Sequence, residues 1–270
     1  MKIGNKEFDL KNHCYIMGIL NVTPDSFSDG GRWNDLNRAG RHVEEMIEEG
    51  AALIDIGGES TRPGHVQISI EEEIQRVVPY IEMVKKNFDI PVSIDSYKPQ
   101  VIEAALKAGA DMVNDIWGLK YDAAVAELIA RYQVPCCLMH NREKAEYGDF
   151  MTDFLSDMRQ TLQIAREAGI SDEQILLDPG VGFGKTYGHN LTVINHLEEL
   201  VKLGYPVLLA TSRKSVIGTA LDLSTDQRVE GTLATTVLGV AKGASFVRVH
   251  DVKENYRAVK MTEAIIKEGK

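Results

Sequence analysis

The amino-acid sequence predicts an α/β protein: a (β/α)8 barrel, the TIM-barrel architecture, with an N-terminal β-hairpin. Short runs of branched apolar residues recur eight times along the 270-residue chain, and each run ends on a polar or charged residue. Such runs are typical of parallel strands that are buried on both faces. Amphipathic stretches lie between the runs, and glycines stand where those helices would end. Eight strand–helix units in roughly 250 residues match the usual size of a barrel.

A doubly wound open sheet is the alternative architecture. That fold normally has fewer strands, and it usually carries a nucleotide-binding loop after its first strand. The residues after the first apolar run here, beginning Asn21-Val22-Thr23-Pro24, do not form such a loop motif. The barrel is therefore the better prediction, and it would bring all eight strand ends to one face of the molecule.

The predicted elements follow one another in a regular order. A turn at Gly4-Asn5 between small apolar groups predicts the hairpin within residues 2–10. The strands are predicted at residues 15–20, 52–56, 92–94, 112–113, 134–139, 175–177, 207–210 and 246–249. Helical stretches include residues 36–49, 70–88, 99–107, 149–167, 191–203, 225–242 and 252–267. The glycines placed as left-handed helix caps are Gly50, Gly109, Gly169, Gly204 and Gly243.

Length and composition set the broad class. The chain is long enough for one domain with an ample core, and we expect a single domain over residues 1–270. No long apolar run or signal-like N-terminus is present, which predicts a cytoplasmic protein with no membrane partner. The formal net charge of −10 argues against a nucleic-acid binder. The odd cysteine count (Cys14, Cys136 and Cys137) and the absence of Cys-x-x-Cys argue against disulfides and a zinc site.

Residues 175–186, ILLDPGVGFGKT, are the stretch around which the rest is organised. The apolar run ends on Asp178, Pro179 stops the strand, and Gly180, Gly182 and Gly184 leave the following backbone without side chains. This arrangement favours a carboxylate presented to a flat ligand, although Asp178 could instead cap a simple turn. The stretch is no phosphate-binding Walker loop, because Pro179 stands where the first glycine is required. The glycine spacing also differs from the dinucleotide fingerprint.

Two loops near the N-terminal half suggest closure and anion binding. The loop after the first strand is long and polar, yet it carries Phe27 and is followed by Trp33, which suggests a loop that closes over a ligand. The second loop, residues 59–64, sets hydroxyl groups beside Arg62. An arginine there suits a phosphate-like oxyanion, since its guanidinium can donate to two oxygens at once.

A second basic group follows the last two strands. Ser212, Arg213 and Lys214 come after the seventh strand, and Arg248 and His250 end the eighth. The loops after strands seven and eight are the usual phosphate region of barrels. Because side chains alternate along a strand, the residues at 248 and 250 point to the same side.

The basic group has an alternative explanation. Either cation of the last strand could instead neutralise Asp55 or Asp95 in a structural ion pair.

The middle strands carry the opposite chemistry. Asp95, Asn114 and Asp178 end the middle strands, and a carboxylate can accept a fork of two N–H groups. The face therefore predicts a ligand with a flat amide- or guanidine-like heterocycle at one end and phosphate at the other.

The motifs together resemble those of dihydropteroate synthases. The phrases, in order along residues 17–251, are MGILNVTPDSFSDGG, IDIGGESTRPG, VSIDS, VNDIWG, LMH, LLDPGVGFGKT, TSRKS and GASFVRVHDV. The resemblance implies a barrel enzyme of folate biosynthesis that joins 6-hydroxymethyl-7,8-dihydropterin pyrophosphate to p-aminobenzoate. It also implies Mg²⁺ as cofactor, a homodimer, and a sulfonamide target.

The resemblance assigns roles position by position. Residues resembling the pterin site are Asp95, Asn114, Met139, Asp178, Phe183 and Lys214. Those resembling the pyrophosphate site are Asn21, Thr61, Arg62, Arg248 and His250, with Asn21 also implied as the metal ligand. Those resembling the p-aminobenzoate site are Phe27, Thr61, Pro63, Ser212 and Lys214. The implied catalytic residues are Asp95, Lys214, Arg248 and His250.

Two positions depart from the family's pattern. Ala210 stands where the family often has glycine, and residues 141–146 are charged and without a clear match. The implied mechanism is an SN1-like loss of Mg-bound pyrophosphate, followed by attack of an arylamine that needs no strong base. Two other functions are the alternatives: a pterin-dependent methyltransferase, which has no pyrophosphate to hold and so leaves the cations unexplained, and a non-catalytic pterin-binding paralogue.

Overall fold

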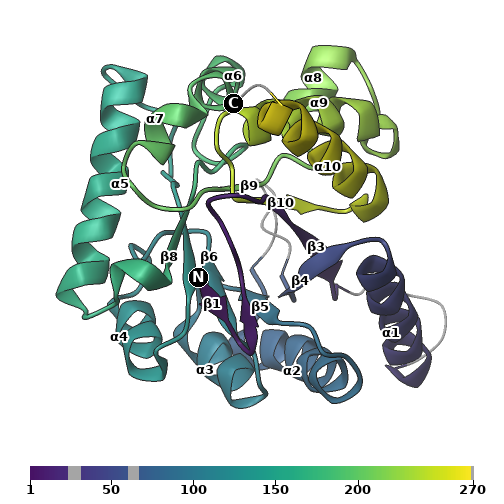
Figure 1. Ribbon diagram of the computed structural model, residues 1–270. Helices are drawn as coiled ribbons and strands as arrows, with labels where there is room; N and C mark the ends of the chain where they lie inside the picture. Colours follow the sequence, from purple (N-terminus) through teal and green to yellow (C-terminus); the bar gives the residue numbers. More distant parts are fainter. Residues whose placement is uncertain (24–31, 60–66, 269–270) are drawn as a thin grey trace.

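The computed structural model describes residues 1–23, 32–59 and 67–268, the side chains of residues 32–34 excepted (Figure 1). Its eight-stranded parallel sheet runs in the order β8-β7-β6-β5-β4-β3-β10-β9. The strands are β3 (Tyr15–Asn21), β4 (Ala51–Gly57), β5 (Val92–Asp95), β6 (Met112–Asp115), β7 (Cys136–Met139), β8 (Ile175–Asp178), β9 (Leu208–Leu209) and β10 (Phe246–Val249). Leu177 pairs with Val207 and donates to the Pro206 carbonyl at 2.9 Å, which brings the two edges of the sheet together. The predicted barrel is thereby confirmed.

Helices surround the strands, as Figure 1 shows. They are α1 (Arg32–Glu48), α2 (Ile70–Asn87), α3 (Pro99–Lys107), α4 (Ala123–Tyr132), α5 (Phe150–Glu167), α6 (Tyr187–Asn195), α7 (Leu197–Val201), α8 (Ser215–Leu221), α9 (Val229–Ala241) and α10 (Val252–Glu268). Each long helix buries one apolar stripe against the sheet, as Val77, Ile81 and Val84 do in α2. All five glycines predicted as helix caps have positive φ, between 86° and 109°.

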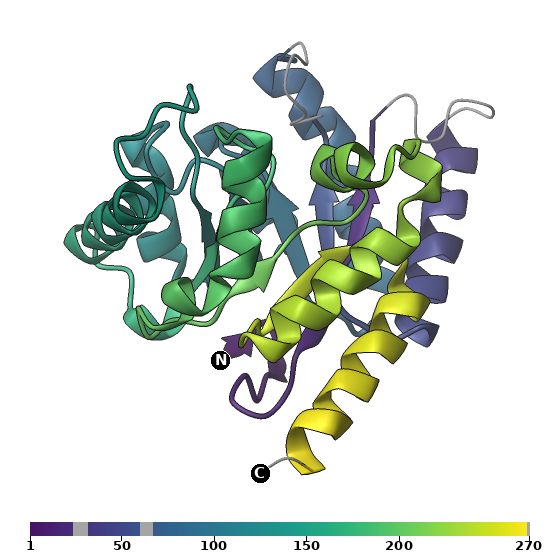
Figure 2. The same cartoon turned by 90° about the horizontal axis from the view of Figure 1, so that it is seen from above.

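The N-terminal hairpin closes one end of the barrel. β1 (Lys2–Ile3) and β2 (Lys6–Glu7) pair antiparallel around Gly4, whose φ is 57°. Phe8 is buried against Tyr15 and Phe246, with ring centroids 4.9 and 5.4 Å away. Figure 2 shows this ribbon at one end of the strands and α8 at the other. The predicted hairpin is confirmed, and it leaves the opposite end of the barrel for the site.

Several predicted boundaries were wrong. The strand expected at 134–139 begins at Cys136, because Pro135 has no N–H and serves only as an acceptor, from Val113. The strand expected at 207–210 is reduced to Leu208–Leu209, with Val207 forming an isolated bridge.

Two predicted helices have different bounds in the structure, and two further helices are present. The helix expected at 191–203 is two helices, because His196 leaves the helical conformation with φ −117° and ψ 32°. The helix expected at 225–242 starts as a 3-10 turn, and α9 begins only at Val229. Helices α4 and α8 are present in addition to the predicted stretches. No helix in the described part of the chain is both long and apolar enough to cross a membrane.

Candidate active site

The strand register lines up polar side chains at the carboxyl end of the barrel. Asn21 of β3 lies opposite Gly57 of β4, Gly57 opposite Asp95 of β5, and Asp95 opposite Asn114 of β6. A Cβ on Gly57 would lie 3.5 Å from the Asp95 Cβ, so the row is closely packed. This end is the one at which barrels carry their chemistry.

Arg248 of β10 joins two carboxylates across the barrel. Its Nε donates to Asp55 Oδ2 at 2.5 Å, and its Nη2 donates to Asp95 Oδ2 at 2.5 Å. Asn114 Nδ2 also donates to Asp55 Oδ2, at 3.1 Å. The sequence left open whether Arg248 serves an anionic ligand or pairs with Asp55 or Asp95, and the structure shows it paired with both.

Burial dominates the electrostatics of this cluster. Desolvation raises the pKa of Asp95 to about 7, with Asp55 adding to the rise and Arg248 opposing it. Burial works against the guanidinium, yet Asp55 and Asp95 raise the pKa of Arg248 above its ordinary value. The second oxygens, Oδ1 of Asp55 and of Asp95, have no hydrogen-bond partner among the described residues. The cluster thus holds one permanent cation and two carboxylates with spare acceptor capacity.

The glycine-rich loop after β8 is bent by its own carboxylate. Asp178 Oδ1 accepts from the Gly180 N–H at 2.6 Å. Gly180 has φ +67°, and a Cβ there would lie 1.9 Å from the His140 carbonyl oxygen. No other residue fits such a position, since it combines a left-handed backbone with a backbone contact. The alternative that Asp178 caps a turn is therefore part of the structure, and only one of its two oxygens, Oδ1, makes this bond.

Lys214 connects the loops after β8 and β9. Its Nζ donates to the Val181 carbonyl at 2.6 Å and lies 4.9 Å from the centroid of the Phe183 ring. Burial lowers the pKa of Lys214 to about 8, and the carboxylate of Asp178 opposes that shift. Burial in turn raises the pKa of Asp178, with Lys214 as the main opposing charge. Each of these two charges therefore reduces the pKa shift that burial causes in the other group.

Apolar side chains line the same end of the barrel. Tyr97, Ile116 and Met139 form a small buried cluster, against which Trp117 and Phe183 pack. The cluster is separate from the main apolar core between sheet and helices. Ala210, the departure from the family pattern, packs elsewhere, in the inner layer with residues such as Met17 and Phe246.

The loops after β9 and β10 meet through Ser212 and His250. Ser212 Oγ lies 2.9 Å from His250 Nδ1, and the His250 N–H donates to the same hydroxyl at 3.1 Å. Arg213 has φ 56° and pairs with Asp251, so its guanidinium turns to that carboxylate. Among the predicted basic group, Lys214 and Arg248 thus act on the same buried carboxylate, Asp178, while His250 contacts Ser212 of the neighbouring loop.

Some predicted residues cannot be placed. Four of them lie outside the described residues: Phe27, Thr61, Arg62 and Pro63. Asn21 is exposed at the end of β3. Within residues 1–23, 32–59 and 67–268, no group of three or more His, Cys, Asp or Glu side chains forms a metal-binding cluster.

Sequence reasoning missed a polar group behind the glycine-rich loop. Lys185 Nζ lies 2.8 Å from His140 Nδ1, and His140 Nε2 lies 3.0 Å from Asp157 Oδ2. In the sequence, Lys185 only belongs to a stretch that fails as a Walker loop, and His140 only ends the phrase LMH. No local signal joins them, because they are 45 residues apart on different loops.

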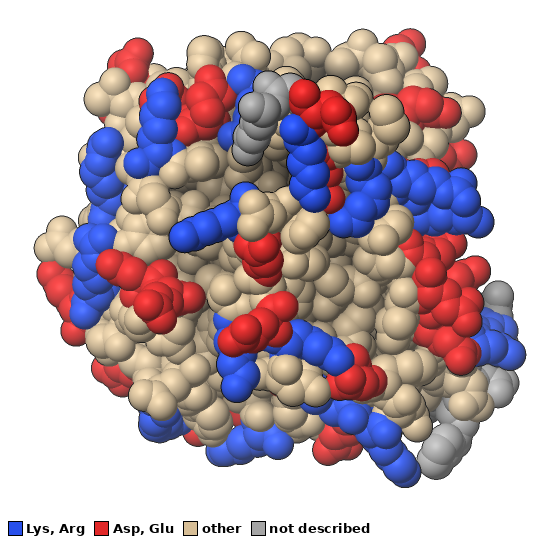
Figure 3. All heavy atoms as spheres, viewed as in Figure 1, with Lys and Arg blue, Asp and Glu red and all other residues tan. Residues whose placement is uncertain are grey.

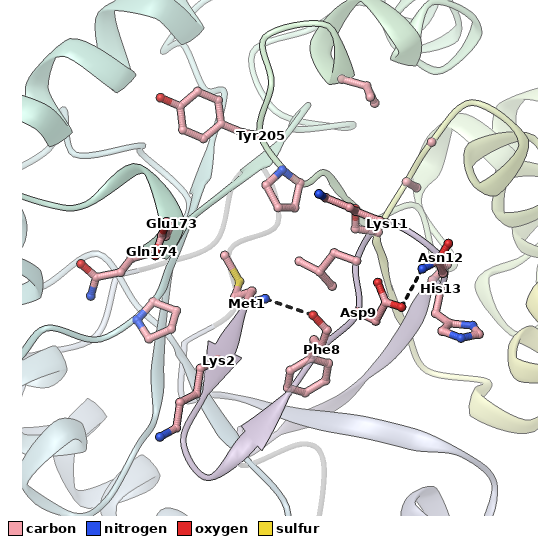
Figure 4. Close-up of a pocket in the computed structure, with 18 of the residues that line it drawn as sticks. Met1, Lys2, Phe8, Asp9, Lys11, Asn12, His13, Glu173, Gln174 and Tyr205 are labelled. Atoms are coloured by element: carbon pink, nitrogen blue, oxygen red, sulfur yellow. Dashed lines mark hydrogen bonds between the residues drawn. The ribbon is translucent and has the colours of Figure 1, made fainter.

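A separate hollow of about 1630 Å³ lies at the hairpin end of the barrel. Figure 4 shows Met1, Phe8, His13 and Tyr205 among the residues that line it, with the Met1 amine donating to the Phe8 carbonyl at 3.0 Å. In Figure 3, which views this end, acidic and basic side chains are interspersed without a field of one sign. The hollow is remote from the strand ends that carry Asp95 and Asp178, so it is not the candidate site.

Comparison with known proteins extends over nearly the whole chain. The model of the family described as pterin binding enzyme matches residues 17–250. A dihydropteroate synthase of Clostridium beijerinckii is 59% identical over 268 residues, which are 99% of this chain and 100% of that protein.

Solved structures agree with this result. A dihydropteroate synthase from Clostridium difficile, crystallised in the presence of pteroic acid, superposes with a TM-score of 0.93 at 51% identity, covering 96% of this chain and 99% of that one. A dihydropteroate synthase from Xanthomonas albilineans with 4-aminobenzoic acid gives a TM-score of 0.90 at 41% identity, covering 94% of each chain.

Proposed function

This chain belongs to the dihydropteroate synthase family of pterin-binding enzymes, and on that premise we propose which of its residues bind each substrate. It is a transferase of folate biosynthesis, which condenses 6-hydroxymethyl-7,8-dihydropterin pyrophosphate with p-aminobenzoate. One observation carries the assignment of the site. Arg248 donates to Asp95 at 2.5 Å, and its charge is one of those that oppose the rise which burial causes in the pKa of Asp178, so the anion-binding and pterin-binding groups share one region.

The pterin ring binds at the acidic side of this region. Asp178 accepts a fork of two ring N–H groups, because a carboxylate matches parallel donors. Asn114 and Asp95 serve the remaining ring edge, and Lys214 donates to a ring acceptor. Met139 and Phe183 form the apolar walls, which their shared cluster with Tyr97 supports.

The diphosphate binds at the basic side. Arg248 and His250 of the last strand neutralise it, together with Asn21 and with Thr61 and Arg62 of the second loop. Positively charged donors aimed at a leaving diphosphate stabilise the charge that develops there. The p-aminobenzoate site consists of Ser212 and Lys214, with Phe27, Thr61 and Pro63.

The donor set fits a Mg²⁺ ion held mainly by the diphosphate itself. Mg²⁺ prefers oxygen ligands, keeps several waters, and is bound in such sites through one or two protein groups plus substrate phosphates. Asn21 offers one exposed amide oxygen at the strand end. When bound, the ion would supply neutralisation of the leaving group.

The reaction is dissociative. The C–O bond to the diphosphate breaks first, its electron pair leaves with the oxygen, and the pterin methylene becomes a ring-stabilised cation beside Asp95. The arylamine nitrogen then donates its lone pair to form the C–N bond and afterwards loses a proton to water. Because the amine is already neutral, no general base of high pKa is needed. Holding both reactants in line supplies up to roughly 7–11 kcal/mol of the barrier lowering.

A pyrophosphate-release assay with and without p-aminobenzoate tests the function. The proposed enzyme releases pyrophosphate in step with 7,8-dihydropteroate formation. A pterin-dependent methyltransferase releases none, and a non-catalytic paralogue binds pterin without turnover. Scrambling of labelled oxygen in the pterin pyrophosphate without amine tests early ionisation. Its absence weighs against the dissociative order, unless the ion pair collapses faster than the diphosphate rotates.

We also propose that the enzyme is a cytoplasmic homodimer with one domain over residues 1–270. Exposed apolar side chains on three helices support self-association: Leu191 of α6, Leu221 of α8, and Val237 and Leu238 of α9. The cysteines are free and buried, which fits a reducing compartment. Light scattering of the purified protein tests the dimer. A monomer mass at micromolar concentration contradicts it, and Leu238→Glu should shift a true dimer toward monomer.

A further inference from the structure

The amine of Lys185 turns back beneath the glycine-rich loop. Its Nζ lies 2.8 Å from His140 Nδ1, 3.0 Å from the Gly180 carbonyl oxygen and 3.1 Å from the Phe183 carbonyl oxygen. Two of these partners are carbonyl oxygens, which can only accept. A fourth, longer contact places Nζ 3.4 Å from the His140 carbonyl oxygen. An ammonium has three N–H donors for these acceptors, whereas a neutral amine has two. Burial lowers the pKa of Lys185 to about 7, with the carboxylate of Asp178 opposing the shift, so both forms are present near neutral pH.

His140 is held in one tautomer by its other neighbour. Its Nε2 lies 3.0 Å from Asp157 Oδ2, and an ionised carboxylate only accepts, so Nε2 carries the proton. Nδ1 is then free to accept from Lys185. The imidazole is fully buried, and that burial lowers the pKa of His140 to about 4, which keeps the ring neutral. Arg142 donates to the same Asp157 oxygen at 2.6 Å.

The loop after β7 therefore supports the loop after β8. A Cβ on Gly184 would lie 2.4 Å from the Arg142 carbonyl oxygen, so the two backbones touch. Tyr147 reinforces the contact, because its hydroxyl donates to the Gly184 carbonyl at 2.7 Å. The charged segment that had no clear match to the family, residues 141–146, thus lies against the glycine-rich loop through Arg142.

Lys185 binds the backbone of two residues, Gly180 and Phe183, that position proposed pterin-binding groups. Gly180, whose carbonyl Lys185 binds, donates its own N–H to Asp178 at 2.6 Å. Phe183, whose carbonyl Lys185 also binds, carries the ring that packs beside Met139 and Lys214. Removing the amine would take the donor away from His140 Nδ1 and from the Phe183 carbonyl oxygen, while the Gly180 carbonyl oxygen would keep the Phe183 N–H, at 3.1 Å. Each unpaired buried group costs about 1–3 kcal/mol.

We propose that Lys185 is a positioning residue for the pterin site: with His140 and Asp157 it fixes the glycine-rich loop so that Asp178 and Phe183 stand ready for the pterin ring. Lys185 itself does not touch the substrate. The inference rests on the proposed pterin site. It assigns a role in substrate affinity to a buried polar group that lies behind the loop.

Calorimetry with 6-hydroxymethylpterin tests the proposal. Lys185→Met keeps the length of the side chain but removes its donors, and we expect the pterin Kd to rise at least about tenfold, equal to 1.4 kcal/mol. The KM for p-aminobenzoate at saturating pterin pyrophosphate should stay within about twofold. Lys144→Met, an exposed lysine on the neighbouring loop, is the matched control and should leave both values unchanged.

Two further variants keep the result decisive. Reversible partial unfolding would itself raise the apparent Kd, so urea unfolding first establishes that the variant is folded at the temperature of the titration. If Lys185→Met does not fold, Lys185→Arg is measured instead. Its flat guanidinium cannot aim one donor at each of the three acceptors, and we expect the pterin Kd to rise at least about threefold. The double variant Lys185→Met/His140→Gln should be little worse than Lys185→Met alone, since both residues act through one contact.

A pterin Kd within twofold of the parent, in Lys185→Met or in the Arg variant that replaces it, overturns the inference. Asp178→Ala separates this failure from failure of the proposed pterin site. If Asp178→Ala also binds pterin normally, the site assignment itself is wrong. If Asp178→Ala loses binding while the Lys185 variant keeps it, only the positioning role fails.

Discussion

Arg248 donates from Nη2 to the Asp95 carboxylate at 2.5 Å, which joins the proposed diphosphate end of the site to the pterin end. The same guanidinium donates to Asp55, a carboxylate with no exposed surface. Without substrate, Arg248 is thus held by two carboxylates. A diphosphate would have to share this cation with Asp95, the carboxylate that we propose lies next to the carbon where positive charge develops.

Arg248→Ala should cripple turnover while pterin binding survives comparatively well. Loss of one preorganised donor to a leaving anion lowers kcat by roughly 10²–10³-fold. The variant should also unfold more easily, because breaking a buried ion pair costs roughly 3–5 kcal/mol. Steady-state pyrophosphate release and urea unfolding measure the two effects. Adding Asp55→Asn should recover part of the stability and none of the turnover, and a kcat within tenfold of the parent would contradict the assignment.

Asp178→Ala should abolish pterin binding. The substitution removes the proposed acceptor for the ring N–H groups. It also removes the acceptor of the Gly180 N–H, which bends the loop. Asp178→Asn keeps one oxygen for one of these two donors and should bind pterin weakly. Calorimetry with 6-hydroxymethylpterin measures both variants. Unchanged pterin affinity in the alanine variant would show that the ring binds elsewhere.

Gly180→Ala should weaken the binding of pterin pyrophosphate in addition to lowering the free energy of unfolding. Gly180 has φ +67°, and a Cβ there would lie 1.9 Å from the His140 carbonyl oxygen, so either loop must move. Gly169 is the matched control: its φ is +86°, but nothing lies within 4 Å of its Cβ position. Both variants should lose roughly 1–2 kcal/mol of unfolding free energy from left-handed backbone. Only Gly180→Ala should raise the KM for pterin pyrophosphate, by at least about tenfold.

The barrel was predictable because its signals are local. Each buried strand is a short apolar run, and five of the helix ends carry a glycine whose backbone the structure shows at positive φ. The errors fall where pairing partners decide the boundary. Pro135 can only accept in the ladder, so the strand starts at Cys136, and His196 breaks what reads as one continuous helix.

The candidate site was predictable where chemistry sits at a strand end. Asp95, Asn114, Asp178 and Arg248 each close an apolar run, and the barrel brings such ends to one face. The partners of these groups were not predictable. The pairing of Arg248 with Asp55 spans 193 residues, and the contact of Lys185 with His140 joins two loops, so neither leaves a periodic trace in the sequence.

Stability should fall below neutral pH, and His140 should be a main cause. Burial lowers the pKa of His140 from 6.5 to about 4 in the folded chain. Below pH 6.5 the unfolded chain therefore takes up a proton that the folded chain does not, so stability is lost as the pH falls from 6.5 to about 4 and the loss levels off below that. The shift corresponds to at most ~3 kcal/mol.

The His140→Gln variant isolates this contribution. Glutamine does not titrate, so the variant should be less stable than the parent near pH 7.5, where the hydrogen bonds of His140 to Lys185 and Asp157 are intact. Its unfolding free energy should then fall less steeply between pH 6.5 and pH 4, because the other titrating groups are common to both proteins. Urea unfolding at pH 7.5, 5.5 and 4.5 measures the difference. Parallel pH profiles for parent and variant would show that His140 accepts a proton in the folded state, and the tautomer that orients Lys185 would then be wrong.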